Sequence, residues 1–391
     1  MTPPAAAIVG VADLVSPTGR LGLEVRAMEV AVIREALADA GLTIADVDAV
    51  FSTSLTGVLA SADLAEYLRI VPRWTDTTMT GGSSFEVMVE HAALALEAGL
   101  CDVALIVYAE NPRTGVTGSA TESTMTAFEV PRPRAIAEWE TPYGTEFPLV
   151  SYALAASRHM AIYGTTPEQL AQIAVSTRQW AANNPVARYR DPITVADVLA
   201  SPSVAEPLHR LDCCVHTDGA GALVMTRADR ARDLLQSPVM VLGAATAHDH
   251  GMGISQMPSI TETAGARTGP LALERAGVTI PDVDVVEVYD SFTITVLLAL
   301  EDIGFCAKGE GGAFVADGRL GPGGSLPTNT SGGGLSYTHP GMFGIFLLVE
   351  AVRQLRGQCG PRQVNNAEIA VAHGCGGFLS CLSTVVLGVD R

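Results

Sequence analysis

The stretch Ala40-Gly-Leu-Thr-Ile-Ala-Asp-Val-Asp-Ala-Val50 recurs later in the chain as Ala276-Gly-Val-Thr-Ile-Pro-Asp-Val-Asp-Val-Val286. Each copy follows a segment of helical character and leads into an apolar segment that is typical of a buried strand. Such self-similarity, here offset from position 40 to position 276, is the signature of a duplicated structural unit. The repeat therefore predicts two halves of one architecture, with a functional site where they meet.

The segments around the first copy alternate between strand-like and helix-like patterns. The predicted order is a strand at 5–15, a helix at 23–40 ending at Gly41, a strand at 47–52, a helix opened by 77–85 and a strand at 103–109. A second series begins with a strand at 238–245. This alternation predicts an α/β fold with a mostly parallel, buried sheet.

Between the two series the regular alternation of predicted strands and helices stops. Residues 111–222 contain long polar, Pro-containing stretches around two predicted helices, 151–163 and 167–183, the second capped by Thr166. We expect this insertion to lie over the sheet, where substrate is commonly bound. The predicted units are residues 1–233, including the insertion, and residues 234–391, which carry most of the candidate site loops.

The composition and net charge of the chain exclude some classes of function. The 391 residues are 48% hydrophobic and 17% charged, with a net charge of −18, which argues against nucleic acid or an anionic membrane as partner. The chain lacks a transmembrane-length apolar run and a basic signal segment. Its seven cysteines lack Cys-x-x-Cys zinc spacing. We expect a cytoplasmic protein with reduced thiols, no metal site and no membrane insertion.

Three loops of the second half carry titratable side chains. Tyr289 follows a predicted strand, Tyr337 and His339 lie in the glycine-rich stretch 332–344, and Cys375 lies in a turn between two apolar strands. Pro340 is expected in the first turn of a helix, which would place His339 at that helix's N-terminus. Because strand C-termini share one edge of a parallel sheet, these loops are expected to converge.

Plainer interpretations stay open from the residues alone. The glycine-rich stretch fits a turn with a helix-capping histidine, Cys375 fits a small turn residue, and the two tyrosines fit amphipathic residues at a pocket edge. His248-Asp249-His250 is more typical of a polar loop than of a metal site.

Several motifs together resemble the thiolase superfamily over nearly the whole chain. They are the Gly332-Gly-x-x-x-x-x-His339-Pro element, Cys213-Cys214 with Thr217-Asp218-Gly219-Ala220, and Tyr163-Gly-Thr-Thr-Pro-Glu-Gln-Leu170. The branch they resemble is the lipid-transfer-protein, or sterol-carrier-protein thiolase-like, branch. The resemblance implies two βαβαβαββ halves in a five-layer α-β-α-β-α arrangement, and a homodimer.

The departures from that family indicate a different reaction. Thiolases carry a nucleophilic cysteine at the start of the helix after the third strand; here that position falls on Gly82 or Ser83. The family's acid/base cysteine is retained as Cys375. Tyrosines stand at 289 and 337 in loops where the family has other residues.

With the nucleophile lost, the resemblance implies retro-aldol cleavage of a β-hydroxyacyl-CoA without a covalent intermediate. The expected substrate is a steroid side-chain 17-hydroxy-20-carboxyl-CoA, giving a ketone and propionyl-CoA. His339 is expected to hold the enolate, with Tyr289 and Tyr337 as acid and base, one needing a lowered pKa. The alternatives are an acyltransferase or thiolase using Cys375 or Ser83, and a non-catalytic subunit that binds acyl-CoA or lipid.

The resemblance also implies the molecules that bind to the chain. An acyl-CoA is the expected substrate, and no cofactor is expected beside it. A small protein with an OB fold and a zinc ribbon is the expected heterologous partner.

Overall fold

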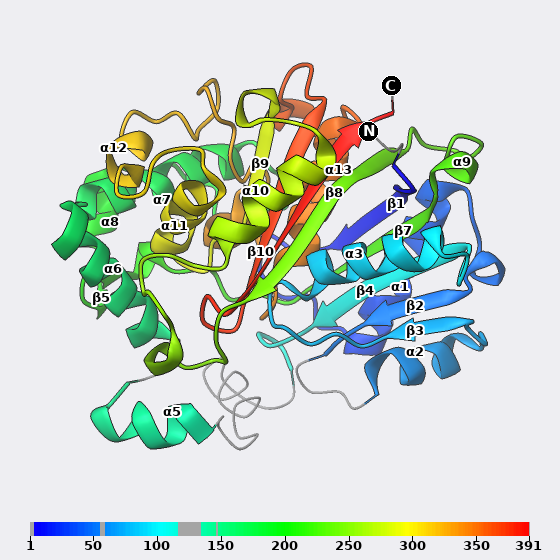
Figure 1. Ribbon diagram of the computed structural model, residues 1–391, viewed down its shortest axis with the longest axis horizontal. Helices are drawn as coiled ribbons and strands as arrows, with labels where there is room; N and C mark the ends of the chain where they lie inside the picture. Colours follow the sequence, from blue (N-terminus) through cyan, green and yellow to red (C-terminus); the bar gives the residue numbers. More distant parts are fainter. Residues whose placement is uncertain (1–3, 55–58, 116–133, 146–147, 391) are drawn as a thin grey trace.

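A mixed sheet runs through the protein in the strand order β3-β2-β4-β7-β1-β8-β11-β10-β9 (Figure 1). The computed structural model describes residues 4–54, 59–115, 134–145 and 148–390. The strands are β1 (Ala6–Leu14), β2 (Ala49–Ser52), β3 (Trp74–Asp76), β4 (Val103–Glu110), β7 (Gly219–Arg227), β8 (Val239–His248), β9 (Val285–Val288), β10 (Ile369–Gly376) and β11 (Cys381–Val389), with β5 (Ser203–Ala205) and β6 (Leu208–His209) forming a separate ladder.

The sheet consists of two similar halves that meet at β1 and β8. These two strands pair only at Ala7–Met240 and Ile8–Val239, whereas the pairing within each half is extensive. In the first half β2 is parallel to both β3 and β4, and in the second half β9 is parallel to β10. The other neighbouring strands of the sheet are antiparallel, so the expectation of a mostly parallel sheet was wrong. The duplication predicted from the sequence repeat is therefore confirmed.

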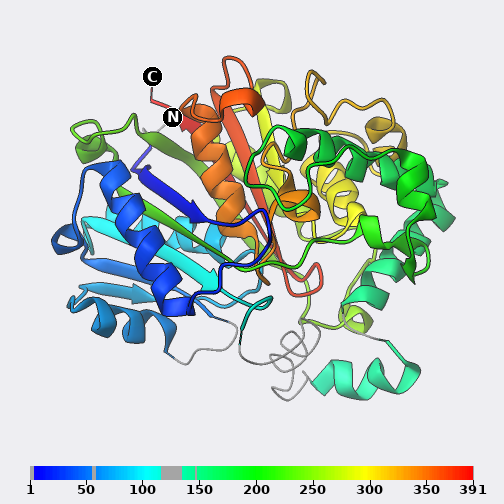
Figure 2. The ribbon, with the colours of Figure 1, turned by 180° about the vertical axis from the view of Figure 1, so that it is seen from behind.

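Helices form three layers around the two half-sheets. α3 (Ser84–Glu97) and α13 (Gly344–Leu355) lie in the middle, in contact with each other and with strands of both halves. α1 (Val25–Ala40) covers the outer face of the first half and α10 (Gly265–Ala276) that of the second. α3 and α10 face the viewer in Figure 1, whereas α1 and α13 do so in Figure 2. This is the expected α-β-α-β-α order.

The remaining helices come mainly from the insertion and gather beside the second half, on the left of Figure 1. They are α5 (Arg134–Trp139), α6 (Leu149–Tyr163), α7 (Pro167–Ala182), α8 (Val195–Ala200), α11 (Thr293–Ile303) and α12 (Gly311–Val315), while α2 (Ala60–Leu68) and α9 (Ala228–Ala231) belong to the first half. Both predicted insertion helices are present, and the Thr166 hydroxyl accepts from the Gln169 amide as a cap.

Two further details differ from expectation. The helix after the glycine-rich loop begins at Gly344, so Pro340 is not in its first turn and His339 is not at its N-terminus. Gly341, at φ 96°, bends the chain away from helical geometry after Pro340. In the described residues, a single bridge between Val286 and Thr328 stands where the second half would have its own third strand.

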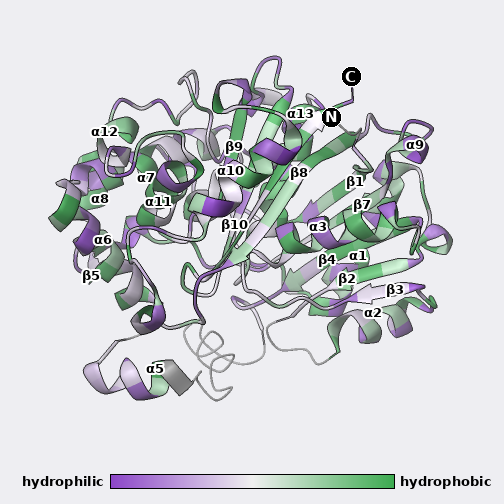
Figure 3. Cartoon of the chain, viewed as in Figure 1, coloured by the Kyte–Doolittle hydropathy of each residue, from purple (hydrophilic) through white to green (hydrophobic). Residues whose placement is uncertain are grey.

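The hydrophobic core lies along the central strands of the sheet. β4 is buried along its whole length, as are most positions of β10 and β11, so both faces of the sheet are covered by helices. Figure 3 shows this as hydrophobic colouring along the central strands. Within the described ranges, none of the helices is both long and apolar enough to cross a membrane.

Candidate active site

Gly82 is one of the two positions at which the family's nucleophile is expected, and the space beside it is filled by a neighbouring tyrosine ring. A β-carbon on Gly82 would overlap the Tyr289 ring, lying 2.5 Å from its Cζ, and would lie 2.5 Å from the Cys375 carbonyl oxygen. Glycine is thus required there for close approach. The space that a side chain at position 82 would occupy belongs instead to Tyr289.

Tyr289 and His339 form the polar centre of the site. The Tyr289 hydroxyl lies 2.9 Å from His339 Nε2, and the two rings meet edge to face with centroids 5.7 Å apart. Phe343 packs against both rings. Because Tyr289 follows β9 directly, and its amide donates to the His373 carbonyl at 2.9 Å, the sheet itself fixes its position.

Both members of this pair are uncharged at neutral pH. Burial raises the pKa of Tyr289 well above 10. Burial, with a smaller contribution from His216, lowers the pKa of His339 to about 4. The sequence-based mechanism needs one basic tyrosine of lowered pKa, and the structure gives the opposite for both Tyr289 and Tyr337. Tyr289 is therefore a neutral phenol that can move a proton only in concert with a neighbour.

The loop that carries His339 is anchored by a buried carboxyl. Asp290 accepts hydrogen bonds from the amides of Gly334 (2.6 Å) and Leu335 (3.1 Å), in a π-helical turn over Gly333–Tyr337. The His339 amide in turn donates to Thr217 Oγ1 at 2.9 Å. Such π-helical turns are rare and often occur at functional sites.

Cys375 lies near the end of β10, and its carbonyl oxygen approaches Gly82. Burial raises the pKa of its thiol to about 12, so Cys375 is a neutral proton donor and not a thiolate nucleophile. Tyr152 of α6 lies beside this thiol and stacks on Phe292 with centroids 4.4 Å apart. Tyr152 could not be found from the sequence because no local motif marks it.

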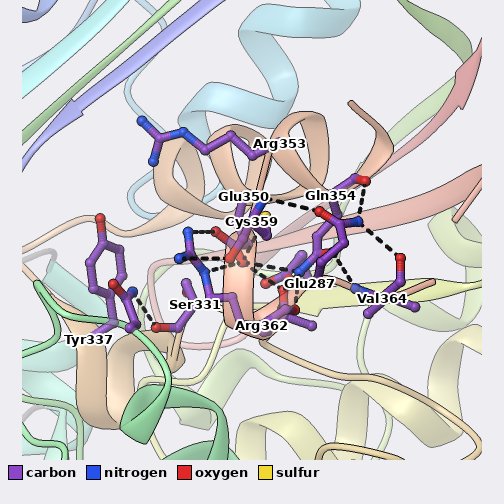
Figure 4. A network of polar contacts seen from close by, with 12 residues as sticks. Glu287, Ser331, Tyr337, Glu350, Arg353, Gln354, Cys359, Arg362 and Val364 are labelled. Carbon is purple, nitrogen blue, oxygen red and sulfur yellow. Dashed lines mark hydrogen bonds and ion pairs between the residues drawn. The ribbon is translucent and has the colours of Figure 1, made fainter. Parts of the chain in front are cut away.

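Tyr337 is directed to a different set of partners. Its hydroxyl donates to Asp13 Oδ2, while Asp13 Oδ1 accepts from Arg353 at 2.7 Å. Burial opposes ionisation of Asp13, but Arg353 and Tyr337 together hold its pKa below the ordinary value. Figure 4 draws Tyr337 and Arg353 beside a buried network in which Arg362 pairs with Glu350 at 2.9 Å.

The structure thus brings together Tyr289, His339 and Cys375, and directs the Tyr337 hydroxyl elsewhere. The acid/base role of Tyr337 stays a prediction, and these contacts lend it no support. Ser83, the other candidate nucleophile, is buried with its hydroxyl 3.1 Å from Thr80 Oγ1. Across the described parts of the chain, no group of three or more His, Cys, Asp or Glu side chains is arranged to hold a metal ion.

Comparison with known proteins agrees with this architecture. Residues 245–389 match the family model described as Thiolase C-terminal domain-like. The chain is 36% identical to the acetyl-CoA acetyltransferase of Methanothermobacter thermautotrophicus, over 88% of each chain. It is 37% identical to the 17-hydroxy-3-oxo-4-pregnene-20-carboxyl-CoA lyase of Mycobacterium tuberculosis, over 90% of this chain and 92% of that one. The solved structure of the Ltp2-ChsH2(DUF35) aldolase matches with a TM-score of 0.88 and 33% identity, over 100% of this chain and 99% of that one.

The chain therefore belongs to the thiolase superfamily. The relatives include an acyltransferase as well as carbon–carbon cleaving enzymes. Within the superfamily, the chain is a carbon–carbon lyase of the lipid-transfer-protein, sterol-carrier-protein thiolase-like branch.

Proposed function

We propose that the chain cleaves a β-hydroxyacyl-CoA by a retro-aldol reaction, giving a ketone and a shorter acyl-CoA, without a covalent intermediate. The observation that carries this proposal is the Tyr289 ring standing in the space of a nucleophile at position 82, hydrogen-bonded to His339 and adjacent to Cys375. A site with a phenol, a neutral imidazole and a neutral thiol suits proton transfer and not acyl transfer.

The first step removes the β-hydroxyl proton. Tyr289 oxygen accepts this proton while its own proton passes to His339 Nε2, 2.9 Å away, so that no free phenolate forms. The Cα–Cβ bond breaks, its electron pair moves to the thioester carbonyl, and the β-carbon leaves as a ketone. The imidazolium formed at His339 then stabilises the enolate oxygen electrostatically.

The second step returns a proton to carbon. The Cys375 thiol, neutral because its pKa is about 12, donates its proton to the α-carbon of the enolate. The proton held on His339 returns through Tyr289 and restores the thiol. Over one turnover the β-hydroxyl thus loses one proton and the α-carbon gains one, and the chemistry uses the CoA thioester as substrate with no further cofactor.

The substrate we propose is a steroid side-chain 17-hydroxy-20-carboxyl-CoA, cleaved to a 17-ketosteroid and propionyl-CoA. The name of the Mycobacterium tuberculosis relative, a 17-hydroxy-3-oxo-4-pregnene-20-carboxyl-CoA lyase, supports this choice. Beside Cys375, the rings of Phe292 and Phe378 pack on Tyr152, and such apolar surroundings suit a large apolar substrate.

We further propose that the chain works as a homodimer with a heterologous subunit bearing an OB fold and a zinc ribbon. The matching Ltp2-ChsH2(DUF35) aldolase is named for two components, which supports a second subunit. β3 lies at the edge of the sheet with Trp74 exposed and is followed by exposed Met79, a surface suited to a second copy. Light scattering of the chain alone and of the mixed subunits tests both assemblies.

The activity is tested by incubating the chain, with and without the partner, with a 17-hydroxy steroid-20-carboxyl-CoA. The expected products are the 17-ketosteroid and propionyl-CoA. An acetylated protein by intact mass after acetyl-CoA treatment, with rate lost in Cys375→Ala, would instead establish acyl transfer. Tight acyl-CoA binding without either reaction would establish a non-catalytic subunit.

A further inference from the structure

Glu86 is a buried acid that the proposed reaction does not use. It lies on α3, one helical turn after Gly82, and is completely buried. Within the described part of the chain, neither of its carboxyl oxygens has a hydrogen-bond partner. A buried carboxyl without a partner destabilises a fold, so its presence calls for an explanation.

Two glycines make room for this carboxyl directly behind the site. A β-carbon on Gly344 would lie 2.8 Å from Glu86 Oε1, and one on Gly374 would lie 2.6 Å from Glu86 Cδ. Gly374 immediately precedes Cys375 in β10, and Gly344 begins α13 after the loop that carries His339. Glu86 therefore lies behind the part of β10 from which Cys375 faces the proposed substrate.

Other buried carboxyls of the chain have cationic or donor partners. Glu350 pairs with Arg362, and Glu301 accepts from buried His159. The nearby titratable groups whose pKa values Glu86 affects are instead two thiols, Cys375 on β10 and Cys381 on β11. From α13, the backbone at Gly344 approaches Glu86.

We propose that Glu86 is a positioning residue that acts through Cys375 and must stay uncharged for turnover. When Glu86 is protonated, the region behind the Cys375 thiol carries no charge. When Glu86 is ionised, it places a negative charge behind the position where the enolate forms. Like charges repel strongly in a poorly solvated interior. This inference rests on the proposed lyase reaction.

Burial sets the pH range in which the ionisation of Glu86 affects turnover. It raises the pKa of Glu86 to about 8, so the carboxyl is neutral at pH 7 and ionises just above. We expect kcat of the wild type to fall above pH 8 by up to about tenfold per pH unit, the slope of a single ionisation.

Glu86→Gln tests the proposal because glutamine has the shape of the neutral acid and cannot ionise. It is expected to keep kcat at pH 7 within about threefold and to lose the decline above pH 8. Glu29→Gln is the matched control: burial also raises the pKa of Glu29, to about 7, but Glu29 lies on α1 and pairs with Arg26 at 2.6 Å. The control should keep the wild-type profile. An unchanged profile in Glu86→Gln overturns the proposal.

A second measurement separates this inference from the function itself. Because the folded pKa of Glu86 is about 8 against an ordinary 4.5, the folded state holds a proton that the unfolded state releases between these values. Wild-type stability relative to Glu86→Gln should therefore decline from about pH 4.5 and level off above pH 8. If wild type releases no ketone, the lyase proposal fails; equal pH dependence of the two urea midpoints overturns the neutral state of Glu86.

Discussion

Tyr289 and Tyr337 are both buried phenols delivered by loops of the second half, yet their surroundings differ completely. Tyr289 meets a neutral imidazole and the bare backbone of Gly82, which the Cys375 carbonyl oxygen also approaches. Tyr337 meets the ion pair of Asp13 and Arg353, and its ring packs on Phe346.

This difference in surroundings shows that residue type and position in a loop do not by themselves decide the catalytic role of a side chain. A phenol bonded to an ionised carboxylate already has its proton engaged, and removing that proton would place two negative charges together. A phenol bonded to a neutral imidazole can accept one proton as it gives up another. From these contacts we expect Tyr289 to transfer the proton and Tyr337 to make a structural contact.

Tyr289→Phe should have the largest effect on turnover. The substitution keeps the ring that fills the space at Gly82 but removes the proton relay to His339, so kcat should fall by about 10²–10⁴-fold. The thermal unfolding midpoint should stay close to wild type, since only one hydroxyl is lost. Steady-state ketone release and calorimetry check the two parts; a variant with full turnover contradicts the relay.

Gly82→Ala should damage both folding and turnover. The new methyl group would overlap the Tyr289 ring and approach the Cys375 carbonyl oxygen, which is backbone and cannot move cheaply. We expect a loss of about 1–3 kcal/mol in the free energy of unfolding from this overpacking. kcat should fall about tenfold or more, since a 1 Å displacement of a reacting group can cost that much. Gly251→Ala is a suitable control because a β-carbon there meets nothing within 4 Å.

Tyr337→Phe should act mainly on stability. It removes a buried hydrogen bond to ionised Asp13, which is worth about 1.5–3 kcal/mol. Urea unfolding measures this loss, and kcat of the folded variant should stay within about threefold of wild type. Collapse of turnover with stability intact would restore Tyr337 to the acid/base pair.

The smallest expected effect is on the acid side of the pH profile. Since the pKa of His339 is lowered to about 4, the imidazole stays neutral down to that pH, and kcat/KM should not decline between pH 6.5 and 5. For stability the sign is equally definite: a depressed histidine pKa favours folding above pH 6.5, and this contribution is lost as the pH falls toward 4. A drop of about fivefold in kcat/KM from pH 6.5 to 5.5 would indicate an ordinary histidine with a pKa of about 6.5.

Local sequence was sufficient for the larger features of this fold. The repeat at 40–50 and 276–286 predicted the two halves, and the capping residue Thr166 predicted the start of α7. The prediction that Pro340 lies in the first turn of the helix was wrong, because the positive φ at Gly341 delays the start of the helix to Gly344. Packing around the loop sets this backbone conformation.

The candidate site was predictable only where its residues sit in motifs. Tyr289, His339 and Cys375 each end a recognisable strand or loop, and parallel strands bring such loops together. The partner of Tyr337 is Asp13, 324 residues away in sequence, and no local pattern links them. Burial, which raised both tyrosine pKa values, is likewise a property of the folded chain.

The central claim is that Tyr289, and not Tyr337, moves the substrate proton. It is tested most directly by single-turnover ketone release from a 17-hydroxy steroid-20-carboxyl-CoA with the Tyr289→Phe and Tyr337→Phe variants side by side, each saturated with substrate. We predict a Tyr337→Phe rate close to wild type and at least about 100-fold faster than that of Tyr289→Phe. Equal rates in the two variants, or a slower Tyr337→Phe, would contradict the claim.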